Sequence, residues 1–417
     1  MEPEPRKPTA PRRLDLGDTH NFGRRVTRRG NRIVKPRTVV WERLLLDASS
    51  PVRSALGEIA LRVGNPKAFD FLPSLDFFPA EEGPGGEVEA IQLAPLGSAG
   101  AFSAGDRAEL ARATGRSLAL WTWLGVSDLH WENLVLGRDP SGTIIFSPVD
   151  IESLFDDLRL PTETKLLPDA DPEYALVSRH ASGVRRVLPY LGKPVSPQTL
   201  VAMAEAYVTA LEWLDGGAAE VAAAIRTVGN LKETPIRVCL RGTGTYVYSQ
   251  TDLQAQIEPL WPPLLDGELE QLDRGDIPYF FRLYGQPGIH HYYSDEDLTS
   301  WKTLPLDGDV PQLEPLLDLE RGLASPGGRS LREEGLFALI AAFDDPSLSG
   351  RHRLGDFTVE LTEDEIIVGF PSGDELACDR DLSDFVAGVY VPCRCGEVET
   401  VFVPAVTTCD GFDIDDL

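Results

Sequence analysis

The sequence predicts an α+β protein with a small β-rich module at its C-terminal end. Three patterns predict this class. Residues 31–46, NRIVKPRTVVWERLLL, are typical of a strand that ends at a proline and is followed by an amphipathic helix. Residues 197–228 are strongly helical. From about Leu354 the pattern changes to short strands bounded by turns.

The other elements follow in chain order. Residues 105–125 predict a helix that leads into the segment SDLHWEN, and TIIFSPVDIE predicts an apolar strand that ends in acidic residues. Residues 158–174 form a polar, proline-containing loop of the kind that covers sites. The later expected elements are the strand TPIRVCLRGTGTYVY, the helix and turn GELEQLDRGDIPYFFRLYG, the helix EEGLFALIAAF, and the strands FTVELTEDEIIVGF, FVAGVYVP and TVFVPAV.

These elements divide the chain into four parts. Residues 1–14, rich in proline and arginine, predict a disordered basic tail. An N-terminal part follows at residues 15–100 and a largely helical part at residues 101–345. Residues 346–417 make the β-rich module, which ends in an acidic tail.

Charge and composition exclude several classes of function. The net charge of -27 argues against a nucleic-acid partner, because the phosphate backbone would be repelled. No apolar run is long enough to span a membrane, and the N-terminus lacks the apolar core of a signal peptide, so we expect no membrane partner and a cytoplasmic location. Residues 1–43 nevertheless carry 12 Lys and Arg against 5 Asp and Glu. This basic start is either a solvated tail or a local anion site.

A cluster of polar residues follows the helix at 105–125. Phosphoryl transfer needs a carboxylate that orients or accepts the proton of the attacking hydroxyl, and an amide oxygen a few residues later that holds magnesium. Asp128, His130 and Asn133 offer this pattern in one short loop. Asp150 then ends an apolar strand, where it can complete the magnesium site, and alternation along the strand places Glu152 on the same face. Each residue alone would more often be a cap or a solvated charge.

A phosphate-binding cation is expected upstream of this cluster. Lys35, with Arg37 beside it, follows the glycine-containing turn GDTHNFGRRV, which includes Gly17 and Gly23. A glycine turn lets backbone amides approach phosphates, although this one is neither a Walker A loop nor a complete G-x-G-x-x-G motif. A single strand lysine is usually only solvated. In this setting it gives the basic N-terminal segment a specific use, which is to neutralise ATP.

Six blocks in this order resemble the dehydratase domain of class II lanthipeptide synthetases. The resemblance covers roughly residues 15–300. It implies a two-lobed fold similar to lipid kinases, in which residues 15–100 are the N-lobe and residues 101–345 the C-lobe. The blocks are GDTHNFGRRV, IVKPR, SDLHWENL, VDIESLF, IRVCLRGTGTY and GDIPYF.

The resemblance implies a two-step reaction. Members of this family phosphorylate Ser and Thr of a ribosomal precursor peptide with ATP and Mg²⁺, and then eliminate the phosphate to give dehydroalanine or dehydrobutyrine. By motif, Asp128 would be the base or orienter of the hydroxyl, and His130 would support the loop. Asn133 and Asp150 would bind magnesium, and Lys35 would contact the nucleotide phosphates.

The resemblance also implies a set of elimination residues. Asp18 and His20 would lie on the phosphate-covering turn and act in elimination, together with Arg237 and Thr243. Elimination needs a base and stabilisation of the departing phosphate, which an arginine and a hydroxyl can provide. Without the resemblance, the arginines of IRVCLRGT would be expected to pair only with this chain's many acids. GDIPYF is expected to be structural, a turn that shapes the pocket wall.

The chain departs from the family in three places. Phe22-Gly23 replaces the usual glycine pair, which predicts a stiffer covering turn. Family members carry a long helical region before the first motif, whereas this sequence starts almost on the motif. It also contains no Cys-His-Gly and no second cysteine placed to complete the cyclase's zinc site. We therefore expect no thioether closure, and a separate cyclase or other maturation enzyme as a further partner beside the Ser/Thr-containing precursor peptide.

The cysteines do not indicate a metal site. Cys393 and Cys395 form a Cys-x-Cys pair with Cys378 and Cys409 nearby, a poor match to common zinc-knuckle spacing. Ordinary thiols are favoured over a structural zinc site, and five scattered cysteines do not form a disulfide framework.

Three functions remain open from the sequence. The first is a stand-alone dehydratase that performs both steps. The second is a kinase for a peptide or small molecule that leaves the phosphate in place. The third is a non-catalytic scaffold with a kinase-like fold that binds a peptide or an enzyme partner.

Overall fold

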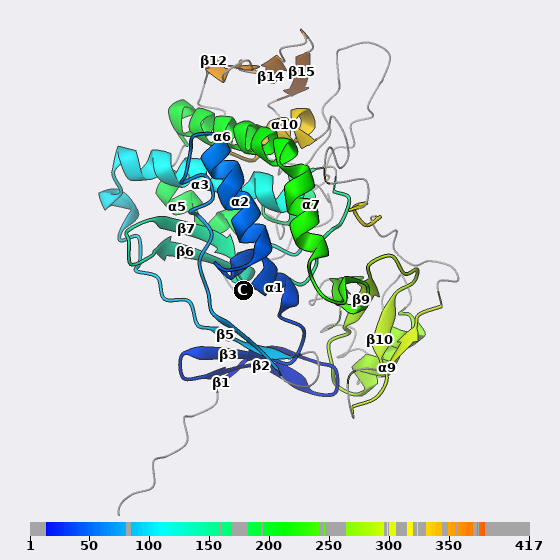
Figure 1. Ribbon diagram of the computed structural model, residues 1–417. Coiled ribbons are helices and arrows are strands. Elements are labelled where there is room, and N and C mark those ends of the chain that lie inside the picture. The colour runs from blue at the N-terminus through cyan, green and yellow to red at the C-terminus, as the bar shows by residue number, and fades with distance from the viewer. Residues whose placement is uncertain are drawn as a thin grey trace, which may run out of the picture. The chain divides into compact units, whose positions relative to one another are not determined.

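The computed structural model confirms a mixed α+β protein with several small antiparallel sheets (Figure 1). Its contacts divide the chain into two units. The first unit comprises residues 1–53, 74–91 and 228–313, and the second comprises residues 54–73, 92–227 and 314–417. The residues that the structure describes are 14–80, 85–158, 160–168, 182–192, 195–241, 246, 264–295, 298, 300–305, 315–319, 323, 331–343, 349–354, 357–369, 373 and 375–379.

The division differs from the boundaries expected from the sequence. Residues 228–313 were expected in the C-lobe, yet their contacts group them with the N-terminal strands. The reason is that the segment around residues 275–277 hydrogen-bonds to the first strand, more than 250 residues earlier in the chain. Pairings of such long separation leave no pattern in the sequence.

The first unit contains a five-stranded antiparallel sheet (Figure 1). Its strand order is β1 (Leu14–His20), β2 (Arg24–Arg29), β3 (Arg32–Lys35), β5 (Gly86–Glu89) and β4 (Phe77–Pro79). The short β2–β3 connection contains Gly30 at φ +65°, a backbone conformation that glycine adopts without steric penalty. The helix expected after the lysine strand is α1 (Val40–Leu46), and its fully buried Trp41 donates its indole N–H to the Pro235 carbonyl at 2.7 Å.

A second sheet of the first unit has the order β11 (Trp301–Thr303), β10 (His290–Tyr292), β9 (Phe280–Leu283) and β8 (Pro235–Val238). All four β9 residues are buried, including Arg282. Helix α9 (Asp266–Asp273) lies between β8 and β9 in the chain, as the GELEQLDRGDIPYFFRLYG pattern predicts.

The second unit is built around two long helices, α3 (Ala104–Trp123) and α6 (Pro197–Gly216). Ser103 and Asp106 form a capping box that starts α3, and Ser196 caps α6 with a proline at its first turn. A side chain at Gly115 would meet the Met203 carbonyl at 2.1 Å, so glycine lets the two helices approach closely. The helical prediction for residues 105–125 and 197–228 is confirmed, and α7 (Ala218–Arg226) continues the second segment.

The described residues also form helices α2 (Pro51–Arg62) and α10 (Glu333–Phe343) and several short helical turns. Helix α2 begins at the boundary of the first unit, and α10 contacts α6. The remaining short elements are η1 (Ala99–Ala101), η2 (Trp131–Asn133), η3 (Pro161–Thr164), η5 (Gly183–Arg186), α5 (Leu188–Leu191) and η6 (Leu231–Glu233).

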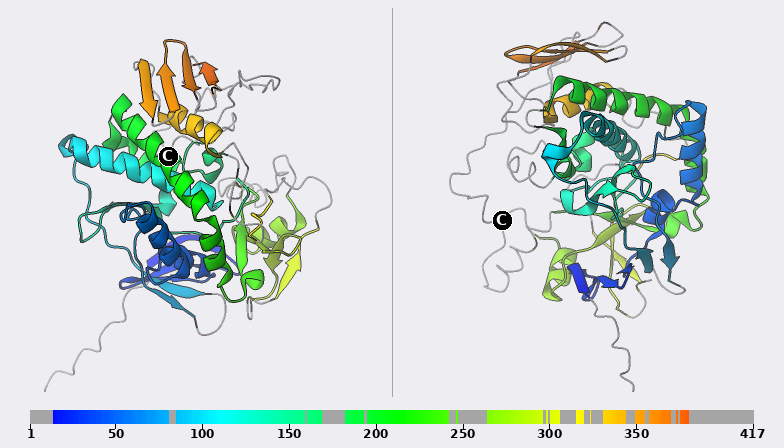
Figure 2. Two further views of the ribbon diagram at one scale, coloured as in Figure 1. Left: turned by 45° about the horizontal axis from the view of Figure 1, so that its top comes forward. Right: turned by 90° about the vertical axis from the view of Figure 1, so that its left-hand side faces the viewer.

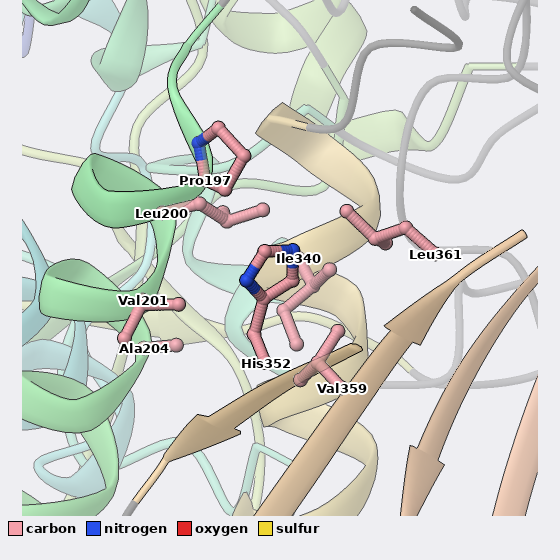
Figure 3. Close-up of a pocket in the computed structure, with 8 residues that line it drawn as sticks. All are labelled: Pro197, Leu200, Val201, Ala204, Ile340, His352, Val359 and Leu361. Carbon is pink, nitrogen blue, oxygen red and sulfur yellow. The ribbon is translucent and has the colours of Figure 1, made fainter. Parts of the chain in front are cut away.

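The expected β-rich C-terminal module forms an antiparallel meander beside α6 and α10 (Figure 2). Its strands in order are β12 (Gly350–Leu354), β13 (Phe357–Leu361), β14 (Glu365–Gly369) and β15 (Glu375–Asp379). A pocket separates this sheet from the helices (Figure 3) and is lined by seven apolar residues and His352. It contains no carboxylate or hydroxyl, so we interpret it as a packing interface.

Several predictions lie outside the described residues. They concern the basic tail before residue 14, Thr243, the strands FVAGVYVP and TVFVPAV, the acidic tail, and the cysteines Cys393, Cys395 and Cys409. Cys378 is described and lies in β15. Among the described helices, none has the length and apolarity to cross a membrane.

Candidate active site

The polar loop of the second unit is held by backbone pairing immediately after α3. Gly125, at φ +63°, lies against Asp156, and a side chain there would meet the Asp156 carbonyl at 1.9 Å. The Asp156 amide donates to the Gly125 carbonyl at 3.0 Å, and the Ser127 amide donates to the Ser153 carbonyl at 3.1 Å. The chain that enters the loop therefore runs beside the chain that follows the acidic segment.

A β-hairpin brings the two proposed magnesium ligands together. Strand β6 (Leu134–Arg138) begins directly after Asn133, and β7 (Ile144–Pro148) ends two residues before Asp150. Leu134 pairs with Pro148, and the Val149 amide donates to the Asn133 carbonyl at 3.0 Å. The hairpin register thus places Asn133 opposite Val149, the residue before Asp150.

Asp128 is fixed by two contacts within the same unit. The Asn133 side-chain amide donates through Nδ2 to the Asp128 carbonyl at 2.9 Å, which leaves the Asn133 amide oxygen as the atom that can bind a cation. Lys165 Nζ lies 3.0 Å from Asp128 Oδ1. Asp128 has φ +64°, a left-handed conformation that is uncommon outside glycine and found often at functional sites.

His130 and Glu152 lie at the margins of this group. His130 is half-buried, and its backbone forms an isolated antiparallel β-bridge with Ser182. Its Nδ1 lies 3.9 Å from the Glu132 carboxylate. Glu152 is buried. Strand β7 ends at Pro148, so the period-two rule does not extend to these residues.

The donor set fits a magnesium ion of the kind that accompanies a nucleotide. Carboxylate and amide oxygens suit Mg²⁺, which usually takes one or two protein carboxylates and completes its octahedron with water and phosphate oxygens. Asp150 and Asn133 would hold it. Within the described part of the chain, no three or more His, Cys, Asp and Glu side chains form a group that could hold a metal ion.

The proposed nucleotide lysine in the first unit forms a buried ion pair. Lys35 Nζ lies 2.6 Å from Glu42 Oε1, and the two side chains are 5% and 1% exposed. Lys35 ends β3, and Glu42 is on the first turn of α1, which directly follows. In protein kinases a lysine on the third strand must pair with a helix glutamate before phosphoryl transfer occurs. Sequence reasoning missed Glu42, although its place in the helix after the lysine strand was a usable signal.

Arg37, Gly17 and Gly23 were also expected to bind the nucleotide, and they lie in three different local structures. Arg37 is buried two residues beyond the end of β3. Gly17 lies within β1, so it is part of a strand and not of the turn. The turn consists of Asn21, Phe22 and Gly23, with φ values of 48°, 70° and 73°.

The amides of this turn are engaged by a residue that sequence reasoning did not single out. The fully buried carboxylate of Asp276 accepts the Phe22 and Gly23 amides at 2.7 and 2.8 Å. The Arg274 guanidinium lies 3.4 Å from Asp276 and 4.1 Å from the centre of the Phe22 ring. The expectation that these backbone amides bind phosphate is therefore not met in this conformation. Asp276, in the GDIPYF block, thus holds the turn through these two hydrogen bonds.

Two of the expected elimination residues meet at one aromatic ring. The His20 ring lies edge-on to Tyr279 with centroids 5.8 Å apart, and the Arg237 guanidinium is 5.5 Å from the centre of the same ring. His20 Nδ1 is 2.7 Å from the Ile277 carbonyl, which can only accept, so Nδ1 carries a proton, and in the neutral ring the lone pair is on Nε2. Asp18 is exposed on β1. Tyr279, between His20 and Arg237, was not predicted.

Comparison with known proteins adds no family assignment. No protein-family model matches the chain. No curated protein matches it either.

Proposed function

We propose that this chain is a lanthipeptide-type dehydratase with a lipid-kinase-like two-lobed fold. It uses ATP and Mg²⁺ to phosphorylate Ser and Thr of a ribosomal precursor peptide in the cytoplasm, and then eliminates the phosphate. The observation that carries this proposal is the β6–β7 hairpin, which pairs Asn133, at the end of the Asp128 loop, with Val149, the residue before Asp150. The buried Lys35–Glu42 pair supports it independently.

The first step is phosphoryl transfer. The Ser or Thr oxygen attacks the terminal phosphorus of ATP, the new O–P bond forms as the bond to the ADP oxygen breaks, and the hydroxyl proton passes to Asp128. Mg²⁺ neutralises phosphate charge when it is bound. Asp128 orients the hydroxyl, Asn133 and Asp150 hold the metal, and Lys35 binds phosphate in an orientation set by Glu42.

The second step is elimination. A base removes the α-proton, the Cα–Cβ double bond forms, and the Cβ–O bond breaks with departure of inorganic phosphate. His20 Nε2 has a basic lone pair, and Arg237 can pair with the leaving phosphate. The shared contact with Tyr279 supports a common role for these two residues.

The proposal is tested by the mass of a substrate peptide. The protein is incubated with ATP, Mg²⁺ and the Ser/Thr-rich peptide encoded beside it. Loss of one water per modified residue is expected, whereas a stable added phosphate would indicate a kinase. An unchanged peptide that nevertheless binds would indicate a scaffold.

An Asp128→Asn variant should abolish the mass change. Glu132→Gln is the matched control, because Glu132 lies in the same loop with a side chain that is 65% exposed. Full activity of Asp128→Asn would contradict the proposed site.

A further inference from the structure

Lys165 holds a position next to the proposed phosphotransfer carboxylate that neither the motifs nor the resemblance assigned to it. Its ammonium nitrogen lies 3.0 Å from Asp128 Oδ1, and the two side chains are 44% and 22% exposed. The lysine head therefore contacts the carboxylate and also reaches solvent. An anion that approaches Asp128 can meet this ammonium as well.

The backbone fixes Lys165 to the Asp128 loop. Lys165 follows η3, and the Leu129 amide donates to the Thr164 carbonyl at 2.8 Å. The Gly183 amide donates to the Lys165 carbonyl at 3.1 Å. One hydrogen bond thus joins the residue after Asp128 to the residue before Lys165, so the pair is positioned by main chain on both sides.

Both members of the pair adopt a left-handed backbone. Asp128 has φ +64° and Lys165 has φ +61°, and neither is a glycine. Such conformations persist where the surrounding structure demands them, and they concentrate at active sites and ligand clamps. Two of them facing each other across a 3.0 Å ion pair indicate a site built for a defined geometry.

We propose that Lys165 contacts the terminal phosphoryl group of ATP during its transfer; this rests on the proposed function. As the attacking oxygen forms its bond to phosphorus and the bond to ADP breaks, the hydroxyl proton neutralises Asp128. The negative charge that the carboxylate loses then resides on the departing ADP, and the phosphoryl group keeps its own negative charge throughout. The Lys165 ammonium beside Asp128 can therefore pair with the phosphoryl oxygens as the carboxylate becomes neutral.

The test compares nucleotides that differ in the terminal phosphate. Isothermal titration calorimetry measures binding of the β,γ-imido analogue of ATP and of ADP, each with Mg²⁺. Lys165→Met should weaken the ATP analogue about tenfold or more, the usual worth of a charge-assisted contact. Binding of ADP should change less than about twofold, because it lacks the contacted group.

Three variants make the result specific. Lys165→Arg keeps the charge and should bind the ATP analogue more tightly than Lys165→Met does. Lys165→Gln provides a second neutral variant, with the same expectation, if the methionine variant does not fold. Lys67→Met is the matched control, an exposed lysine of the same unit, and should bind both nucleotides like the wild type.

Equal losses for both nucleotides would show a structural role and overturn the inference, as would unchanged binding of the ATP analogue. If the wild type binds the ATP analogue but Lys165→Met shows no selective loss, only this inference is overturned. The proposed function then still stands. Wild-type protein that binds neither nucleotide would overturn both.

Discussion

The Lys35→Met substitution removes the ammonium that lies 2.6 Å from the Glu42 carboxylate. Because the side chains are 5% and 1% exposed, water cannot replace the lost cation. Removing one partner of a buried pair costs about 3–5 kcal/mol. For a folding unit of this size that corresponds to a decrease of about 6–20 °C in melting temperature.

The double variant Lys35→Met/Glu42→Leu distinguishes the contribution of Lys35 to stability from its role in phosphoryl transfer. Replacing both charges by apolar groups removes the buried unpaired carboxylate, so its stability should return to within about 1–2 kcal/mol of the wild type. Phosphorylation should stay abolished, because the phosphate-binding cation is gone.

Thermal melts and peptide mass spectra of the three proteins measure both effects. Arg43→Met is the control, a substitution on the same helix that removes a half-exposed pair with Asp47 at 3.4 Å and should cost at most about 1 kcal/mol. A loss below about 1 kcal/mol for Lys35→Met would refute the buried-charge reasoning. Phosphorylation by the stable double variant would refute the role of Lys35.

Three other predictions follow from the first unit. Asp276→Ala leaves two turn amides without their acceptor and should cost roughly 2–4 kcal/mol in urea denaturation, and an unchanged midpoint would contradict it. Arg237→Ala should accumulate phosphopeptide in the mass assay, whereas normal dehydration would exclude its role in elimination. Burial lowers the pKa of His290 and His291, so the unfolded chain binds more protons, and the free energy of unfolding should fall as pH drops below about 6.5. A His291→Gln variant should flatten this dependence in melts between about pH 5 and 7.5, and an unchanged slope would contradict it.

The helices and strands that the sequence predicted well are determined by residues close together in the chain. The helix at residues 105–125 has its own capping box, and the strand and helix around Lys35 carry clear periodic patterns. Asn133 and Asp150 could be placed together because a hairpin of short connection joins them, and close neighbours in sequence determine its register.

The features that sequence missed depend on distant partners or on irregular backbone. Asp276 binds amides more than 250 residues away, and nothing near it predicts that contact. Lys165 meets Asp128 across 37 residues through an isolated left-handed turn, which periodicity does not encode. Strand β7 ends at Pro148, earlier than the apolar pattern suggests, so strand alternation does not determine where the Glu152 side chain lies.

The most direct test of the account is the effect of magnesium on ATP binding by Asp150→Asn. If Asp150 and Asn133 hold the metal of the nucleotide complex, Mg²⁺ should strengthen binding of the β,γ-imido analogue to the wild type and to Glu132→Gln. It should have little effect on Asp150→Asn. An Asp150→Asn protein that keeps the full magnesium effect would contradict the assignment of this hairpin as the metal site.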